Sequence, residues 1–190
     1  MKVANVVANA RSRRRFVQDA CVSDDVLLDM IECARLSPSA GNLQRLKFMP
    51  VSDRLRCDKL FPSLRWAGYF KDWSGPADGQ RPAAYIVIFH DANLGAENYV
   101  DLGIAAQSIN LCAVGDHGLA CCMIGAFDPD EVRNSLLPGR TDLTPLLVIA
   151  VGVPDESVVV EPMTDGNVHY WRDSNGVHHV PKRTDVVLFG

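Results

Sequence analysis

Four arginines stand within five residues near the start of the chain, in the segment Arg11-Ser12-Arg13-Arg14-Arg15. Guanidinium groups this close repel one another unless they are solvated or share an anion. Their planar forks match phosphate oxygens, and a serine hydroxyl adds a compact donor. We interpret this segment as a phosphate-ester site, while a solvated basic turn stays open as the alternative.

A tight polar turn at residues 37–44, with the sequence SPSAGNLQ, is the second feature that could do chemistry. Its small residues would let a flat ligand approach the backbone, and Pro38 would offer that ligand a rigid apolar face. Asn42 provides both a hydrogen-bond donor and an acceptor. The composition is also that of ordinary turns, so this segment alone predicts little.

Two further segments complete the set. The run Cys122-Met123-Ile124-Gly125 is expected to be a strand that ends at a glycine, and Lys182 with Arg183 offers a second anion contact near the C-terminus.

We predict no metal site. Adjacent residues on a strand point to opposite faces, so the neighbouring histidines at 178–179 cannot easily bind one ion and are interpreted as structural. The six cysteines, including the pair at 121–122, are interpreted as reduced, mostly packed thiols.

The elements that must position these residues follow from hydrophobic periodicity and capping. Helices are expected at 3–10, after the N-cap Ser23, and after Asp128, which is followed by proline. Strands are expected at 46–51, 84–89 and 146–153, the last two buried on both faces. The loop at 62–82 is expected to contain some helix, and Asn175-Gly176 predicts a hairpin. The helix at 99–114 is apolar almost all round, so a partner subunit is expected to cover part of it.

Composition restricts the class of protein. A chain of 190 residues, 47% hydrophobic and 22% charged, suits one globular domain spanning 1–190. The net charge of −4 argues against a nucleic-acid binder. Residues 102–115, the longest apolar segment, are interrupted by polar side chains, so no membrane helix is expected. We see no signal peptide at the start of the sequence and expect a cytoplasmic protein.

Taken in order, the motifs RSRRRF, SPSAGNLQ, LGIAAQSINLCAV, CMIGAFD and HHVPKR resemble the nitroreductase family of FMN-dependent oxidoreductases. They extend from residue 11 to residue 183, and the chain looks like the short, single-domain branch of that family. The resemblance implies an α+β fold with a mixed central sheet surrounded by helices. It also implies a homodimer with shared active sites, the long buried helix at the dimer interface and the C-terminal segment extending onto the partner.

The resemblance assigns two groups of residues to the FMN site. The phosphate and ribityl end would be held by Arg11, Ser12, Arg13, Arg14, Lys182 and Arg183. The flavin ring would lie against Pro38, Ser39, Ala40 and Asn42 of the other subunit, with Ile124 and Gly125 near N5 and Lys71 at the N1–C2=O edge. Two departures from the family pattern affect this assignment. Gln44-Arg45-Leu46 replaces a frequent Gln-Pro-Trp, and Ala10 stands where many members carry another arginine.

The activity implied is NAD(P)H-dependent reduction of nitroaromatics, quinones or related small electrophiles by ping-pong hydride transfer through flavin N5, with no dedicated catalytic side chain. Three other interpretations stay open. The chain could be a flavin carrier or sensor without sustained turnover, a flavin-modifying or dehalogenating member of the same fold, or a cofactor-free interaction protein that uses its basic segment. The sequence does not distinguish NADH from NADPH.

Overall fold

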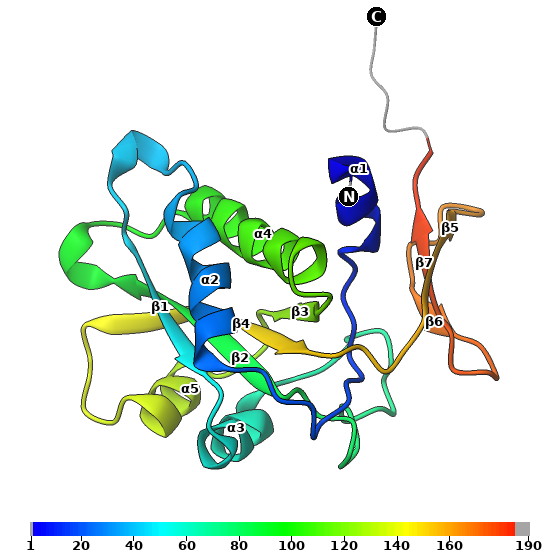
Figure 1. The fold of residues 1–190 in the computed structure, drawn as a ribbon, viewed down its shortest axis with the longest axis horizontal. Helices are drawn as coiled ribbons and strands as arrows, with labels where there is room; N and C mark the ends of the chain where they lie inside the picture. The colour runs from blue at the N-terminus through cyan, green and yellow to red at the C-terminus, as the bar shows by residue number, and fades with distance from the viewer. Residues whose placement is uncertain (1, 185–190) are drawn as a thin grey trace, which may run out of the picture.

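The computed structural model describes residues 2–184, and a four-stranded sheet lies at its centre (Figure 1). The strands are β1 (Leu46–Val51), β2 (Ala84–Asp91), β3 (Ala120–Ile124) and β4 (Leu143–Gly152), in the order β1-β2-β4-β3. The two central strands, β2 and β4, are the continuous apolar runs of the sequence, and their inner residues are buried on both faces. The expected strands are thereby confirmed, with β4 starting a few residues earlier than predicted.

The prediction of a mixed central sheet is wrong in one respect, although the α+β class is confirmed. Every described pairing in this sheet is antiparallel, with Leu46 opposite His90 and Cys121 opposite Val151. Periodicity reports burial but not strand direction, because antiparallel strands covered on both faces give the same continuous apolar runs as parallel ones. Mixed pairing occurs instead in a second, smaller sheet.

That second sheet is formed by β5 (Val158–Pro162), β6 (Trp171–Arg172) and β7 (His178–Lys182). Strand β5 runs parallel to β7, and β6 pairs with β7 antiparallel through the hairpin predicted at Asn175-Gly176. In Figure 1 this sheet stands on the same side of the molecule as α1 (Val3–Asn9), and residues that follow α1 line one hollow together with residues of β7. The predicted extension of the C-terminal segment onto a partner stays a prediction, and residues 185–190 at the end of the chain lie outside the described residues.

Helices cover both faces of the central sheet (Figure 1). On one face α2 (Asp24–Arg35) packs against α4 (Tyr99–Gly115), and their buried residues join those of the strands in one core. On the other face lie α3 (Arg54–Leu60) and α5 (Pro129–Leu136), capped by Asp53 and Asp128. The caps predicted at Ser23 and Asp128 are confirmed, since each side chain accepts a backbone hydrogen bond from its helix.

Helix α4 positions much of the site and has an almost uniformly apolar sequence. Leu102, Ala105 and Ile109 are buried against α2 and the sheet, whereas Tyr99 and Val100 at its start are exposed. Apolar residues exposed on a helix are typical of surfaces that are covered in an assembly. The dimer interface predicted for this helix stays a prediction.

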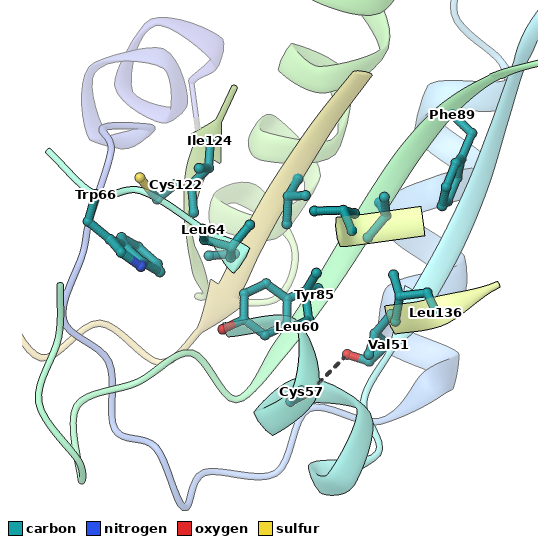
Figure 2. Close-up of a cluster of buried hydrophobic side chains, with 14 of the residues drawn as sticks. Val51, Cys57, Leu60, Leu64, Trp66, Tyr85, Phe89, Cys122, Ile124 and Leu136 are labelled. Carbon is teal, nitrogen blue, oxygen red and sulfur yellow. Dashed lines mark hydrogen bonds between the residues drawn. The ribbon is translucent and has the colours of Figure 1, made fainter. Parts of the chain in front are cut away.

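The second core lies beneath α3 and α5. Figure 2 draws its side chains as sticks, with Trp66 and Tyr85 among those labelled. It includes the side chains of Cys122 and Ile124, so strand β3, which ends at the site, is packed against this core. The loop at 62–82 contributes Leu64 and Trp66 to this core, but it contains only the end of a single 3-10 turn, Phe61–Ser63, and is otherwise turns and irregular chain. Across residues 2–184, no helix combines the length and apolar character needed to cross a membrane.

Candidate functional site

The arginine segment is an extended strip of backbone that is tied to two strands. The Arg13 amide donates to the carbonyl of Cys121 at 3.0 Å, and the Asp155 amide donates to the carbonyl of Arg15 at 2.9 Å. Phe16 ends the strip with a fully buried ring that forms an isolated bridge to Pro154. The strip therefore lies across the ends of β3 and β4, and its side chains project to both sides.

One side of the strip faces a hollow of about 280 Å³ between α4, β3 and β7. Arg11, Ser12, Arg14 and Lys182 all line it, so the structure brings together cationic residues from both ends of the chain, as predicted. The other lining residues come from the elements that frame the hollow: Ala10, Gln107, Asn110, Cys121, Met123, Tyr170, His178 and Val180. None of these lining side chains is a carboxylate, so the three cations have no anionic partner within the hollow.

Several buried polar atoms of this hollow have no hydrogen-bond partner. They are Nη1 of Arg14, Oδ1 of Asn110 and both ring nitrogens of His178. Buried polar groups are nearly always paired in folded proteins, so a group of unpaired ones in a hollow indicates a polar ligand. Three cations together with unpaired donors fit a phosphate ester well.

His178 shows how strongly this region disfavours additional positive charge. Its side chain is 1% exposed and packs against the rings of Phe70 and Tyr170. Burial, followed by the charge of Arg14, lowers the pKa of His178 to about 4. The imidazole is therefore neutral near pH 7 and can donate one hydrogen bond and accept another. His178 was predicted to be structural; its ring is buried, it lines the hollow, and neither ring nitrogen has a hydrogen-bond partner.

A second hollow of about 180 Å³ continues from the first. Arg14, Met123 and Tyr170 line both, and we call the two together the groove. Ile124 and Gly125 lie in the second hollow, just where β3 ends. The predicted phosphate-end and N5-end residues of this chain therefore share one groove. Cys122 also lines it, but burial raises the pKa of its thiol to about 11, which disfavours the nucleophilic thiolate.

The other side of the arginine strip meets a carboxylate that sequence reasoning missed. Glu156, with a side chain 1% exposed, accepts a hydrogen bond from the Arg14 backbone amide and another from Nη2 of Arg172 at 2.8 Å. Burial lowers the pKa of Arg172, and Glu156 opposes that effect. The sequence shows only that Glu156 is an acidic residue in the segment directly after β4. The fold shows that this carboxylate contacts Arg14 and Arg172.

The turn at 38–42 lies elsewhere in the same chain. Its residues Ala40–Asn42 form a 3-10 turn, and Asp101 at the start of α4 accepts from the Ala40 amide at 2.9 Å. The arginine strip meets the same helix further along, where the Asn110 side chain donates to the carbonyl of Ala10. Nine residues of helix correspond to about 13 Å. Figure 1 likewise shows this turn and α1 at opposite ends of α4.

The 38–42 turn has an unusual backbone. Gly41, Asn42 and Gln44 all have positive φ values between 47° and 58°. Non-glycine residues in this region are uncommon and concentrate at functional sites. Pro38, Ala40 and Asn42 are exposed, while Ser39 is half-buried and, with Pro38, borders a separate hollow beneath α2. The turn is therefore an exposed projection that lies outside the lining of this chain's own groove.

The remaining predicted residues lie outside the lining of the groove. Arg13 is half-buried, and its Nη1 donates to the carbonyl of Asn9 at 2.9 Å. Arg183 is exposed at the end of β7. Lys71 borders a different, open hollow together with Trp73 and Trp171. These assignments stay predictions. The cations that line the Ile124–Gly125 end of the groove are Arg14 and Arg65, and Lys71 is not among them.

Comparison with solved structures supports the architecture. The chain is 24% identical to an FMN-dependent nitroreductase from Clostridium difficile, with 81% of this chain and 88% of that one covered and a TM-score of 0.64. It is 21% identical to a nitroreductase family protein from Streptococcus pneumoniae, with 88% and 96% covered and a TM-score of 0.67.

A third structure, from Exiguobacterium sibiricum, is named as a nitroreductase and contains FMN. This chain is 16% identical to it, with 82% and 89% covered and a TM-score of 0.66. At these identities the likeness shows a shared fold.

No curated protein matches the sequence. The model of the family described as "Nitroreductase family" matches residues 7–153, which include the arginine strip, α4 and the end of β3. The chain therefore belongs to the nitroreductase family.

Proposed function

We propose that this protein binds FMN in the groove and works as an NAD(P)H-dependent flavin oxidoreductase. The observation that carries the proposal is the hollow with three cations, no lining carboxylate and unpaired buried polar atoms, continuous with the end of β3. Membership of the nitroreductase family supports it. The phosphate end is assigned to Arg11, Ser12, Arg14 and Lys182, with Arg13 and Arg183 as outer contacts.

Bound FMN would supply the hydride-accepting and hydride-donating chemistry. The protein's part is to hold the phosphate by charge, to present the backbone at Ile124–Gly125 and to place the positive charge of Arg14 along the groove. A fixed cation favours negative charge that develops nearby during reduction. We assign no side chain as acid or base, because His178 is neutral and buried and Cys122 is a protonated thiol near pH 7.

We further propose a homodimer in which each groove is completed by the other subunit. The 38–42 turn is exposed but lies about 13 Å along α4 from the arginine strip, too far to close its own groove. A two-fold axis beside α4 would exchange these ends, since an isologous contact brings residue i of one copy to residue j of the other. Pro38, Ser39, Ala40 and Asn42 would then cover one flavin face.

The proposed substrates are NADH or NADPH as reductant and a nitroaromatic, quinone or related small electrophile as oxidant, used in alternation. Trp66 and Ala67, which line the Ile124–Gly125 end of the groove, are positioned to contact such planar molecules. The replacement of Pro-Trp by Arg45-Leu46 should alter the pocket that the oxidant enters. The cytoplasmic location and the single domain at 1–190 stay predictions.

The test is a spectrum of the purified protein followed by an anaerobic half-reaction. We expect yellow protein with about one FMN per chain that bleaches on adding NADH or NADPH and recovers its colour on adding a quinone. A dimer by light scattering is also expected. Yellow protein that fails to bleach would favour a flavin carrier. Colourless protein that takes up no added FMN, and that binds oligonucleotides in a salt-dependent way, would overturn the proposal.

A further inference from the structure

Three side chains of metal-binding type cluster between α2 and the C-terminal end of α4, outside the lining of the groove, and a fourth, Cys33, lies on the same face of α2. Asp29 and Cys33 lie one helical turn apart on α2, Cys112 lies in the last turn of α4, and His117 follows in the next turn. Residues four apart on a helix share one face. Sequence spacing predicts no metal site because these pairs are separated by about eighty residues and meet only through helix packing.

The geometry of the cluster is compact. One ligand atom each from Asp29, Cys112 and His117 lie within 4.8 Å of one another, and Nε2 of His117 is 2.8 Å from Oδ2 of Asp29. The fourth group, Cys33, lies one helical turn from Asp29 and packs against the core shared by α2 and α4, but its thiol is not one of the three clustered atoms.

The turn after α4 fixes the position of the histidine. The Asp116 amide donates to the carbonyl of Cys112 at 3.0 Å, and the Leu119 amide donates to the carbonyl of Ala113 at 2.8 Å. Gly118 has φ +63°, a conformation that lets the chain reverse directly after His117. The backbone of the histidine is therefore held over the helix end, and its ring contacts the Asp29 carboxylate.

We propose that Asp29, Cys33, Cys112 and His117 bind one Zn²⁺ that joins α2 to α4. Two sulfurs, one imidazole and one carboxylate are a tetrahedral ligand set typical of zinc. Zinc–ligand distances of about 2.0–2.3 Å put neighbouring ligand atoms about 3.3–3.8 Å apart. The cluster reaches that spacing if the thiols move inward and the His117–Asp29 pair opens slightly to admit the ion.

The site is accessible to an ion but backed by the core. The Asp29 side chain is 58% exposed and that of His117 is 21% exposed, whereas Cys112 is buried. An ion can therefore enter from the solvent side and bind against a rigid wall. Since α2 and α4 together cover one face of the central sheet, the metal would act as a cross-link that stabilises the folded state.

The experiment uses the full chain with its native FMN content, kept reduced with a phosphine and first stripped of metal by a chelator. Zinc is added and counted by mass spectrometry, and Co²⁺ is used in parallel as a spectroscopic probe. We expect one Zn²⁺ per chain, a rise in melting temperature, and cobalt d–d bands with a thiolate-to-cobalt charge-transfer band. The d–d bands that lie at longer wavelength than the flavin absorption are the readout.

Matched variants test the ligand set. Cys112→Ser and His117→Asn should each weaken zinc binding by at least about 100-fold, by analogy with the losses seen when metal-site residues are changed. Cys21→Ser, which removes an exposed thiol outside the cluster, should leave stoichiometry and spectrum unchanged. If the buried Cys112→Ser variant fails to fold, His117→Asn and Asp29→Asn, on the solvent side of the site, carry the test.

Three results would overturn the proposal. One is wild-type protein that takes up no stoichiometric Zn²⁺ or Co²⁺ under reducing conditions. Another is a cobalt spectrum that survives both His117→Asn and Asp29→Asn. The third is a Cys33–Cys112 disulfide that persists under the reducing conditions of the experiment and leaves no thiolates for a metal. Flavin content is read separately from the yellow absorption, so failure here is distinguishable from failure of the FMN proposal.

Discussion

The two sides of the arginine strip use the same residue type in opposite ways. On the groove side Arg11 and Arg14 meet Lys182 and no carboxylate, and polar atoms there have no partner. On the opposite side, which we call the carboxylate side, Arg15 lies with Asp155 and Glu156 around a polar hollow. Glu156 is hydrogen-bonded to both the strip and Arg172. One sequence motif therefore contains a binding surface and a structural ion network, set back to back.

The difference shows how a dense positive cluster can fold without its ligand. The buried carboxylate of Glu156 compensates part of the charge from behind, where it also holds the backbone of Arg14. The guanidinium of Arg14 rests over the ring of Tyr170, 4.6 Å from its centroid, and remains available in front. Because that counter-charge lies on the other side of the strip, the three cations that line the first hollow have no carboxylate beside them in its lining.

The largest effect is expected from removing that counter-charge. Glu156→Gln leaves Arg172 buried without its ion-pair partner, and breaking a buried pair in this way typically costs about 3–5 kcal/mol. We expect a comparable loss in the free energy of unfolding, measured by urea denaturation. Asp155→Asn is the matched control, because Asp155 is exposed, and it should cost less than about 1 kcal/mol. Equal losses in the two variants would remove the distinction between the sides.

The second effect concerns the arginines themselves. Arg14→Ala should weaken FMN binding by about 10- to 100-fold, because hydrogen bonds to charged groups are worth about 1.5–3 kcal/mol. Arg15→Ala, its neighbour on the carboxylate side, should change the affinity by no more than about two-fold. Titration of the apoprotein, followed by quenching of flavin fluorescence, measures both. An Arg15 variant that binds as weakly as the Arg14 variant would contradict the assignment of sides.

The third effect is a dependence of stability on pH that originates on the groove side. The pKa of His178 is about 4 in the folded protein against 6.5 for the ordinary group, so the unfolded chain binds the extra proton between these values. The contribution of neutral His178 to the free energy of unfolding is therefore fully present above about pH 6.5. It declines as the pH falls towards 4, and about 2 kcal/mol of it is lost at pH 5. Urea denaturation at several pH values measures this decline.

His178→Phe should flatten the dependence, because Phe keeps a ring between Phe70 and Tyr170 but cannot titrate. His169→Phe, at an exposed position, should keep the wild-type slope. Adding FMN should reduce the loss, since a bound phosphate favours the protonated imidazole. A slope that is unchanged in the His178 variant would assign the acid sensitivity to other groups.

The smallest effect is expected at Lys71, whose hollow does not include Arg14. Lys71→Ala should alter both FMN affinity and the rate of reduction by NADH by less than about three-fold, as is usual for exposed surface charges. Stopped-flow bleaching at the flavin band checks the rate, with Arg14→Lys for comparison. A large loss of rate with unchanged affinity would instead place Lys71 at the flavin edge, as the family resemblance implies.

Local signals predicted the elements of this fold well. Asp128 before Pro129, Ser23 before α2 and Asn175-Gly176 each act over a few residues, and each produces the expected cap or turn. Strand direction was missed because burial alone does not encode it, as the antiparallel partners of β2 show. Helix in the 62–82 loop was overestimated because Trp66 and its neighbours pack as single side chains without regular backbone.

The site was predictable where the sequence keeps its residues close together and less so where the fold assembles them. Arg11, Ser12 and Arg14 were singled out by type and spacing, and Lys182 by its basic character near the C-terminus, and all four line the first hollow. Glu156 and the unpaired nitrogens of His178 depend on contacts between segments far apart in sequence. The cluster at Asp29 and Cys112 is the extreme case, because neither helix alone contains a recognisable ligand spacing.

The buried ring of Phe16 has a consequence for how quickly a ligand can be accepted. Its ring packs closely against the Gly152 backbone, so that a β-carbon at Gly152 would lie 3.0 Å from it. This contact anchors one end of the strip, and the Arg13 hydrogen bond to β3 anchors its middle. With its backbone set beforehand, the strip loses little conformational freedom on docking. Apoprotein should therefore take up FMN in one rapid phase, without a slow ordering step at its N-terminal segment.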